Sequence, residues 1–150
     1  MSFTIGLFPA AANASDKRID GFNYLNLVTD DVFWFVQISD IHIGRSIDAE
    51  NNLKWIVHNL PRFVKPEFIV ETGDLTDSLF EFVRNAEWIT YSQIVNSDAD
   101  FLAEYHDIPG NHDRYGDPNW NGYIAYSWSG FVQHQTKPND PVGEFVWTVH

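Results

Sequence analysis

Three short apolar runs, separated by two segments with helical periodicity, constrain the fold of this chain more than any other feature. The runs cover residues 32–38, 68–72 and 105–108 and contain many β-branched and aromatic side chains, which is typical of strands buried on both faces. Between them, apolar residues recur at helical spacing over residues 48–60 and 82–95. The order β-α-β-α-β predicts an α/β fold with parallel strands joined by crossover helices.

Local signals predict where the helices begin and end. Asp48 is expected to be the N-cap of the first helix, and Pro61 and Pro66 are expected to end it. A further short helix is predicted near residues 120–126, and a final strand over residues 144–149. The core face of the second helix is expected to contain Phe82, Ala86, Ile89 and Ile94.

The composition is that of one globular domain. At 150 residues the chain is long enough to bury a core, and 44% of its residues are hydrophobic. The formal net charge of −12 argues against duplex nucleic acid or an anionic membrane as the main partner. The absence of cysteine excludes disulfides and thiolate metal sites, and no apolar stretch reaches the roughly 20 residues of a membrane span.

Residues 1–31 are interpreted as a lead-in segment before a single domain over residues 32–150. Within the lead-in, residues 1–14 are expected to be disordered or trimmed, because no basic residue precedes their short, interrupted apolar run. The alternative is a remnant of a signal peptide, since residues 12–14 (Ala-Asn-Ala) resemble a small-residue cleavage site. The localisation is therefore left open, with a secretory or lumenal one as the alternative.

Polar motifs follow each of the three predicted strands. They read Asp40-x-His42, Gly73-Asp74-x-x-Asp77 and Gly110-Asn111-His112-Asp113. Ligand sites of α/β proteins gather at the carboxyl ends of the strands. Carboxylate, imidazole and amide groups without sulfur suit Mn, Fe or Zn. Taken together, the three motifs predict a two-metal hydrolytic centre, although any one of them alone is better explained as a hydrogen-bonded loop or turn.

The residue types suggest a division of labour within these motifs. Asp40 and His42 alternate along an extended segment, so both side chains can face one point. Asp74 offers two oxygens and can bridge two cations, which neither an amide nor an imidazole does. His112 can bind a phosphate oxygen or protonate a leaving alkoxide. Asp77 is the natural partner to fix the tautomer of that histidine.

The chain resembles the calcineurin-like metallophosphoesterases in their first three motifs, and the resemblance runs from about Val32 onward. It implies a four-layer α-β-β-α sandwich, of which this chain supplies the β-α-β-α-β start and lacks the C-terminal half. The metal ligands it implies are Asp40, His42 and Asp74 for a first divalent ion and Asp74 and Asn111 for a second, with Asp74 bridging. It also implies in-line attack on a phosphate ester, with His112 and Asp77 as the catalytic pair. Arg45 is a candidate contact for the substrate phosphate, with a solvated surface arginine as the alternative.

The sequence departs from this family after the third motif. The family completes its site with a later histidine and a Gly-His-x-His motif, and neither is present here. The other histidines are expected not to be ligands: His58, His106, His134 (placed in a polar loop) and His150. We interpret the chain as an N-terminal fragment of a longer phosphoesterase, which by itself hydrolyses weakly or not at all. Its strands would then leave an apolar sheet face uncovered.

Two other functions are compatible with parts of the pattern. A catalytically silent scaffold could keep this fold for protein binding, but it would need none of the predicted ligands. Hydrolysis of glycosides by a carboxylate pair, Asp40 and Asp74, would leave His42, Asn111 and His112 without a role. The expected partner is therefore a phosphate-ester substrate.

Overall fold

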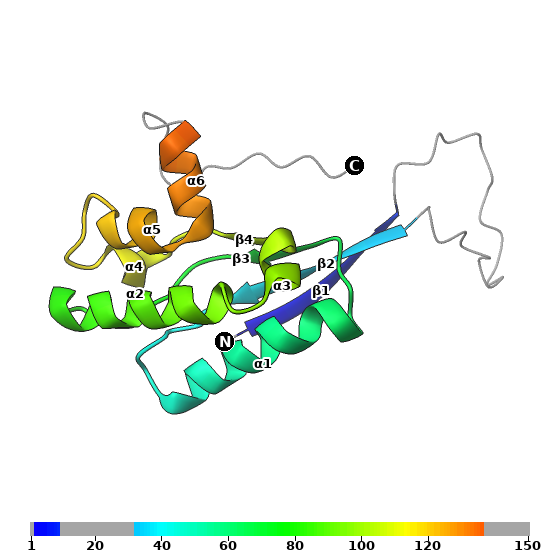
Figure 1. The fold of residues 1–150 in the computed structure, drawn as a ribbon, viewed down its shortest axis with the longest axis horizontal. Coiled ribbons are helices and arrows are strands. Elements are labelled where there is room, and N and C mark those ends of the chain that lie inside the picture. The colour runs from blue at the N-terminus through cyan, green and yellow to red at the C-terminus, as the bar shows by residue number, and fades with distance from the viewer. Residues whose placement is uncertain (1, 10–31, 137–150) are drawn as a thin grey trace, which may run out of the picture.

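The computed structural model describes residues 2–9 and 32–136, which form an α/β arrangement of a four-stranded sheet and helices (Figure 1). The strands are β1 (Ser2–Pro9), β2 (Val32–Ser39), β3 (Phe68–Glu71) and β4 (Tyr105–Asp107). The helices are α1 (Ile47–Phe63), α2 (Glu81–Val95), α3 (Ala99–Glu104), α4 (Asn111–Arg114), α5 (Asn121–Tyr126) and α6 (Trp128–Thr136). The predicted α/β class and the β-α-β-α-β order are confirmed.

The sheet has the strand order β1-β2-β3-β4. As predicted, β2, β3 and β4 are parallel, with Val36 beside Ile69 and Ile69 beside Tyr105. β1 pairs with β2 in the antiparallel direction along its whole length. Because β2, β3 and β4 run in one direction, their carboxyl ends, which carry the polar motifs, meet at one edge of the sheet.

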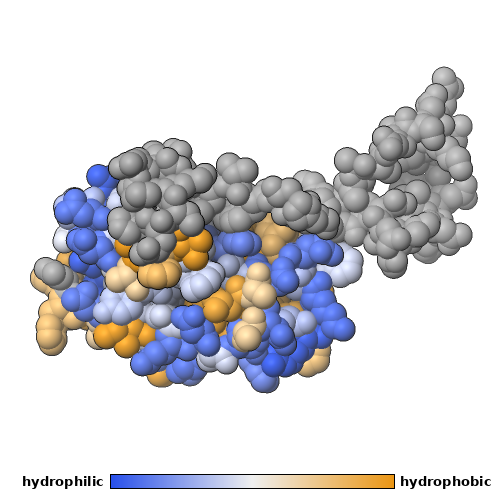
Figure 2. Space-filling view, turned by 45° about the horizontal axis from the view of Figure 1, so that its top comes forward, coloured by the Kyte–Doolittle hydropathy of each residue, from blue (hydrophilic) through white to orange (hydrophobic). Residues whose placement is uncertain are grey.

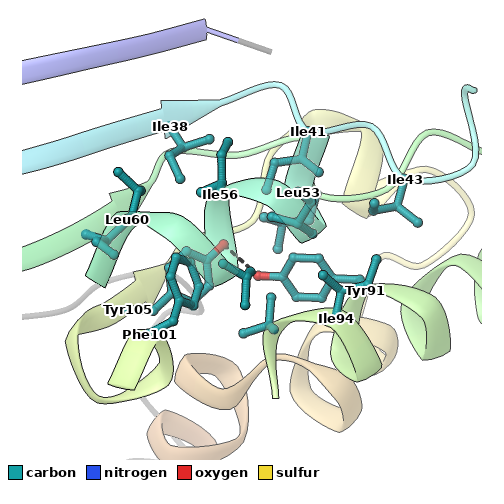
Figure 3. Close-up of a cluster of buried hydrophobic side chains, with 14 of the residues drawn as sticks. Ile38, Ile41, Ile43, Leu53, Ile56, Leu60, Tyr91, Ile94, Phe101 and Tyr105 are labelled. Atoms are coloured by element: carbon teal, nitrogen blue, oxygen red, sulfur yellow. Dashed lines mark hydrogen bonds between the residues drawn. The ribbon is translucent and has the colours of Figure 1, made fainter. Parts of the chain in front are cut away.

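The core lies on one face of the sheet, between the strands and helices α1, α2 and α3 (Figure 3). Val36, Ile38 and Ile69 are fully buried on this face. They pack with side chains of the covering helices: Leu53, Ile56, Val57, Leu60, Trp88, Tyr91, Ile94, Val95 and Phe101. On the other face Phe35 and Phe68 stack with ring centroids 4.8 Å apart and are half-buried. The uncovered apolar sheet face stays a prediction.

Several local predictions are wrong. Residues 2–9 are not disordered, because they add an antiparallel strand to the sheet; the division at residue 31 stays a prediction. Ser46, not Asp48, is the N-cap of α1, and its hydroxyl accepts from the Ala49 amide. Pro61 lies inside this helix, which continues to Phe63.

The core face of α2 also differs from the prediction. Phe82, Ala86 and Ile89 are exposed, whereas Trp88 and Tyr91 are buried. Exposed apolar side chains gather where this helix begins: Leu79, Phe80, Phe82 and Val83. Figure 2 shows apolar areas among hydrophilic ones on the face it presents. Among the described residues no helix combines the length and the hydropathy needed to cross a bilayer.

The remaining predictions concern the C-terminal part of the chain. The short helix expected near residues 120–126 is α5. His134 is part of α6 rather than of a loop. The predicted strand over residues 144–149 and His150 lie outside the described residues.

Candidate metal centre

Backbone hydrogen bonds continue past the ends of β2 and β3 and bring the first two motifs side by side. The Asp40 amide donates to the Gly73 carbonyl at 3.0 Å, and the His42 amide donates to the Asp74 carbonyl at 2.9 Å. Ile43 then forms a parallel bridge with Thr76. These backbone contacts hold the two loops side by side. Asp40, His42 and Asp74 therefore lie at the same edge of the sheet.

The backbone at these positions adopts a conformation that non-glycine residues seldom take. Asp40, His42 and Asp74 have φ angles of 58°, 52° and 60°, in the left-handed region. They are three of the five described non-glycine residues with positive φ. Such a conformation costs on the order of 1–3 kcal/mol per residue and concentrates at functional sites. All three residues are predicted metal ligands, so the strained backbone coincides with the predicted site.

Close contact between two glycines adds the third motif. A Cβ atom on Gly110 would lie 2.2 Å from the Asp74 amide nitrogen, and one on Gly73 would lie 2.8 Å from the Gly110 Cα. Neither position has room for a side chain. The approach also lets the His112 amide donate to Asp74 Oδ1 at 2.9 Å. His112 thus lies over the same carboxylate that follows β3.

Donor atoms of these loops face one another without direct hydrogen bonds. His42 Nε2 lies 3.8 Å from Asp40 Oδ1 and 3.8 Å from Asp74 Oδ2. Among the described residues, one donor atom each of His42, Asp74 and His112 lies within 4.8 Å of the others. Two ligands held about 2.1 Å from one ion are roughly 3–4 Å apart. The spacing therefore fits a shared cation better than it fits hydrogen bonds.

Asp77 contacts both histidines, though in a different way from the prediction. Its carbonyl oxygen is 3.0 Å from His112 Nδ1, and a carbonyl can only accept, so this nitrogen carries a proton. Its carboxylate is nearer His42, with Oδ1 at 3.0 Å from His42 Nδ1 against 3.9 Å from His112 Nδ1. The Asp77 carboxylate is within ion-pair distance of the buried His42, but the two groups do not have hydrogen-bond geometry. The contact at His42 Nδ1 leaves His42 Nε2 facing the carboxylates of Asp40 and Asp74.

The two other predicted residues are less tightly placed. Asn111 is exposed, and its Nδ2 donates to the Tyr115 hydroxyl at 3.2 Å, which leaves its amide oxygen available. The Tyr115 ring also meets the His112 ring edge-on, with centroids 5.1 Å apart. Arg45 is exposed, and its side chain forms no hydrogen bond or ion pair with the described residues. The structure therefore brings together Asp40, His42, Asp74, Asp77 and His112, which we call the donor cluster.

Sequence reasoning gave no role to Asp113, although it is the last residue of the third motif. Its carboxylate is fully buried and accepts from the Leu75 amide at 3.1 Å, the Thr76 amide at 2.8 Å and the Gly110 amide at 2.8 Å. Burial raises the pKa of this carboxyl, and the amide bonds partly oppose the rise. Asp113 ties the second and third motifs together. Its position two residues after Asn111 was the only signal for this role in the sequence.

Two buried glutamates were also missed. Glu71 ends β3, and its Oε2 accepts from the Gly73 amide at 2.8 Å, while its Oε1 is buried without a partner. Burial raises the pKa of Glu71 well above its ordinary value, and the charges of nearby carboxylates add to the rise. Glu87 on α2 accepts from the amides of Asp77 and Ser78. Neither residue belongs to a motif, so only the tertiary structure could reveal them.

A second polar cluster lies at the end of β4. Asp107 is buried, and its two carboxylate oxygens accept from the hydroxyls of Tyr91 and Ser127. Its carbonyl oxygen accepts from the Tyr123 hydroxyl at 2.7 Å. The hydroxyls of Tyr91 and Tyr105 are 3.0 Å apart (Figure 3). We call this group, Tyr91, Tyr105, Asp107, Tyr123 and Ser127, the hydroxyl cluster; burial raises the pKa of its carboxyl and of its buried phenols.

Comparison with known proteins agrees with this geometry. Over 106 residues the chain is 32% identical to transmembrane protein 62 of Mus musculus. The matched region covers 65% of this chain and 16% of that protein. Over 110 residues it is 31% identical to the Arabidopsis thaliana protein named "Putative metallophosphoesterase At3g03305", covering 64% of this chain and 14% of that protein. The chain thus spans less than a fifth of either relative. The family model for calcineurin-like phosphoesterases matches residues 33–148, and the chain belongs to that family.

Proposed function

We propose that the donor cluster hydrolyses phosphate esters, as a phosphomonoesterase or phosphodiesterase, by in-line attack between two divalent ions. The observation that carries the proposal is the convergence of His42, Asp74 and His112, whose donor atoms lie within 4.8 Å of one another at the carboxyl edge of the sheet. Membership of the calcineurin-like phosphoesterase family supports the same chemistry. The residues present suit Mn, Fe or Zn, because they offer nitrogen and oxygen but no sulfur.

Each residue has a proposed task at the site. Asp40, His42 and Asp74 would hold the first ion, and Asp74 and Asn111 the second. When bound, the two ions supply positive charge that activates the attacking water and stabilises the leaving oxygen. Arg45 is kept as a candidate contact for the substrate phosphate, because it is exposed three residues after His42.

His112 is proposed to donate a proton to the leaving alkoxide or a hydrogen bond to the phosphate. Its Nδ1 proton is engaged by the Asp77 carbonyl, so proton transfer falls to Nε2. The ring is held on two sides, by the edge-on contact with His42 at 4.6 Å and by the Tyr115 ring. This support limits rotation of the ring away from the site.

The donor cluster alone is one protein ligand short at the first ion and two short at the second, if the family's pattern applies. We propose that these 150 residues do not supply the missing donors, because the sequence lacks the later histidine and the Gly-His-x-His motif of the family. The 150-residue chain without them would then be weakly active or inactive. The substrate is proposed to be a phosphate ester other than duplex nucleic acid, because a net charge of −12 opposes a polyanion.

Hydrolysis assays on purified protein would test this function. The 150-residue chain and the product of the full open reading frame would be compared on p-nitrophenyl phosphate and its bis ester, with Mn²⁺ added. An Asp74→Asn variant is the control for each. We expect turnover by the full product, little or none by the short chain, and loss of turnover in the variant.

Other results would replace the proposal. If no form turns over either ester and calorimetry detects no Mn²⁺ binding, the chain is a scaffold that keeps the fold for protein binding. If the short chain itself turns over with Asp74 required, its own residues complete the site. If turnover survives Asp74→Asn, the hydrolysis takes place elsewhere in the protein.

A further inference from the structure

Glu87 is a buried carboxylate on α2 that faces the loop after β3. Only 6% of its surface is exposed, and its Oε2 accepts from the Asp77 amide at 3.2 Å and from the Ser78 amide at 2.9 Å. Two backbone donors on one carboxylate oxygen make a strong, charge-assisted attachment. Burial raises the pKa of Glu87, and the amide hydrogen bonds from Ser78 and Asp77, together with the buried Arg84 one turn earlier, partly oppose the rise.

The residue held by Glu87 is the one that contacts both histidines. The carbonyl of Asp77 accepts from His112 Nδ1, and its carboxylate lies 3.0 Å from His42 Nδ1. The Asp77 amide is shared between Glu87 Oε2 at 3.2 Å and the Ile43 carbonyl at 3.1 Å, and the next amide, that of Ser78, donates to Glu87 at 2.9 Å. A shift of this loop would therefore move the partners of both rings at once.

Glu87 also touches the first loop of the site. A Cβ atom on Gly44 would lie 2.0 Å from Glu87 Oε1, so the glycine is in direct contact with the carboxylate. Gly44 is two residues after His42 and has a φ angle of +101°. Any side chain at this position would displace the glutamate. Glu87 thus lies between the loop of His42 and the loop of Asp77.

We propose that Glu87 is a positioning residue that fixes the orientation and the tautomers of His42 and His112 through Asp77. The role rests on the proposed function for its catalytic consequence, because the two histidines would bind an ion and transfer a proton. The orienting part rests on the hydrogen bond between His112 Nδ1 and the Asp77 carbonyl and on the 3.0 Å contact between the Asp77 carboxylate and His42 Nδ1. Carboxylates that hold histidines indirectly typically change metal affinity or activity 10–100-fold when lost.

Four variants separate positioning from simple support of the fold. Glu87→Met removes both acceptor oxygens at similar length, whereas Glu87→Gln keeps one acceptor and removes the charge. Val95→Ala is the matched control, because Val95 is buried on the same helix and its truncation lowers stability at a distance of about 12 Å along the axis. Glu87→Asp, which withdraws the carboxylate by one methylene, serves if Glu87→Met does not fold.

Two readouts apply to these variants. The first is ¹⁵N NMR of the histidine rings in metal-free protein, at a pH where the rings are neutral, which reports tautomers without any activity. The second is kcat and KM of the full open reading frame product. We expect Glu87→Met to shift the tautomer populations of both rings and to lower kcat about 10–100-fold with little change in KM. Glu87→Gln should recover most of the kcat, and Val95→Ala should change neither readout.

The outcomes distinguish this inference from the proposed function. Unchanged tautomers in Glu87→Met and Glu87→Asp would overturn the positioning role. A kcat loss in Val95→Ala equal to that in Glu87→Met would also overturn it, because the effect would then follow stability alone. If the wild type hydrolyses no phosphate ester but the tautomers still shift in Glu87→Met, the positioning role stands and the proposed function fails.

Discussion

The donor cluster and the hydroxyl cluster lie at the same edge of the sheet but satisfy their polar atoms in different ways. In the hydroxyl cluster both carboxylate oxygens of Asp107 accept protein hydrogen bonds, and its carbonyl accepts a third. In the donor cluster His42 Nε2 lies 3.8 Å from two carboxylates and forms a hydrogen bond to neither. In the hydroxyl cluster the protein itself satisfies the polar atoms of Asp107. In the donor cluster His42 Nε2 and the two carboxylates face one another at a spacing that a bound ion would fill.

The backbone follows the same division. Asp107 belongs to a regular strand, whereas Asp40, His42 and Asp74 have positive φ in the loops beyond their strands. Strain without an evident packing gain is typical of a functional site. The comparison teaches that an aspartate at a strand end is informative only together with its partners. An aspartate whose oxygens all accept protein hydrogen bonds has a structural role. An aspartate that faces other potential metal ligands without hydrogen bonds is a candidate for a functional role.

The largest effect is expected at the centre of the donor cluster, in Asp74→Asn. Removal of a single electrostatic donor from an active site costs about 10²–10³-fold in rate, and Asp74 is proposed to hold two ions. We therefore expect activity of the full product to fall by more than about 10³-fold, with Mn²⁺ binding lost in calorimetry. Thermal unfolding should change little, because the Asn side chain can still accept from the His112 amide.

The matched change in the hydroxyl cluster should act on stability instead. Asp107→Ala removes the acceptor of the buried Ser127 hydroxyl and one of the two partners of the Tyr91 hydroxyl, the other being Tyr105. We expect the free energy of unfolding to fall by about 3 kcal/mol, because each unsatisfied buried group costs roughly 1–3 kcal/mol. Chemical denaturation would measure the loss, and Asp107→Asn, which keeps an acceptor oxygen, should lose less. Mn²⁺ affinity reduced as strongly as in Asp74→Asn would contradict the separation of the two clusters.

The fold could be predicted largely from apolar patterning, and the errors have physical causes. Parallel strands such as β2 and β3 are buried on both faces, so their sequences are apolar throughout and easily recognised. β1 was missed because its residues resemble a leader segment, and its pairing with β2 is a tertiary event. The core face of α2 was wrong because Phe82 and Ile89 are as apolar as Trp88 and Tyr91, and periodicity alone does not choose between faces.

The site shows the same limit. Asp40, His42, Asp74 and His112 could be predicted because their motifs follow recognisable strands, and the structure places them together. Glu87 could not be predicted, because its role depends on contacts made across the fold with a loop nine and ten residues earlier. The contact of the Asp77 carboxylate with His42 rather than His112 is also beyond motif reasoning, since it depends on loop geometry. The sequence therefore identifies the candidate metal ligands, but not the residues that hold them in place.

A smaller effect is expected at the edge of the donor cluster, in Tyr115→Phe. The variant removes the hydroxyl that holds Asn111 Nδ2 and keeps the ring against His112. Loss of such an orienting contact typically weakens a metal site 10–100-fold, and the long, exposed bond puts the expected change near the lower limit, at about tenfold for the second ion only. Two-site calorimetry with Mn²⁺ would resolve the two ions, with Tyr126→Phe as a control outside the site. Equal weakening of both ions would contradict this role.

The smallest effect is expected at Glu71, which lies between the two clusters. Burial is the largest cause of the raised pKa of Glu71, and the charges of Asp107, Asp113 and Asp40 add to the rise. The folded state therefore keeps a proton that the unfolded state loses above about pH 4, and stability falls as pH rises from there through the folded pKa.

Glu71→Gln removes this titration and keeps an oxygen for the Gly73 amide. In metal-free protein with EDTA, the variant should be more stable than the wild type at about pH 8 and should lose that advantage toward about pH 4. Urea denaturation at the two pH values would measure it, with the exposed Glu104→Gln as the control. An equal loss of stability at both pH values would mean that Glu71 acts through its hydrogen bond alone. The carboxylates of the two clusters would then have no measurable effect on the pKa of Glu71.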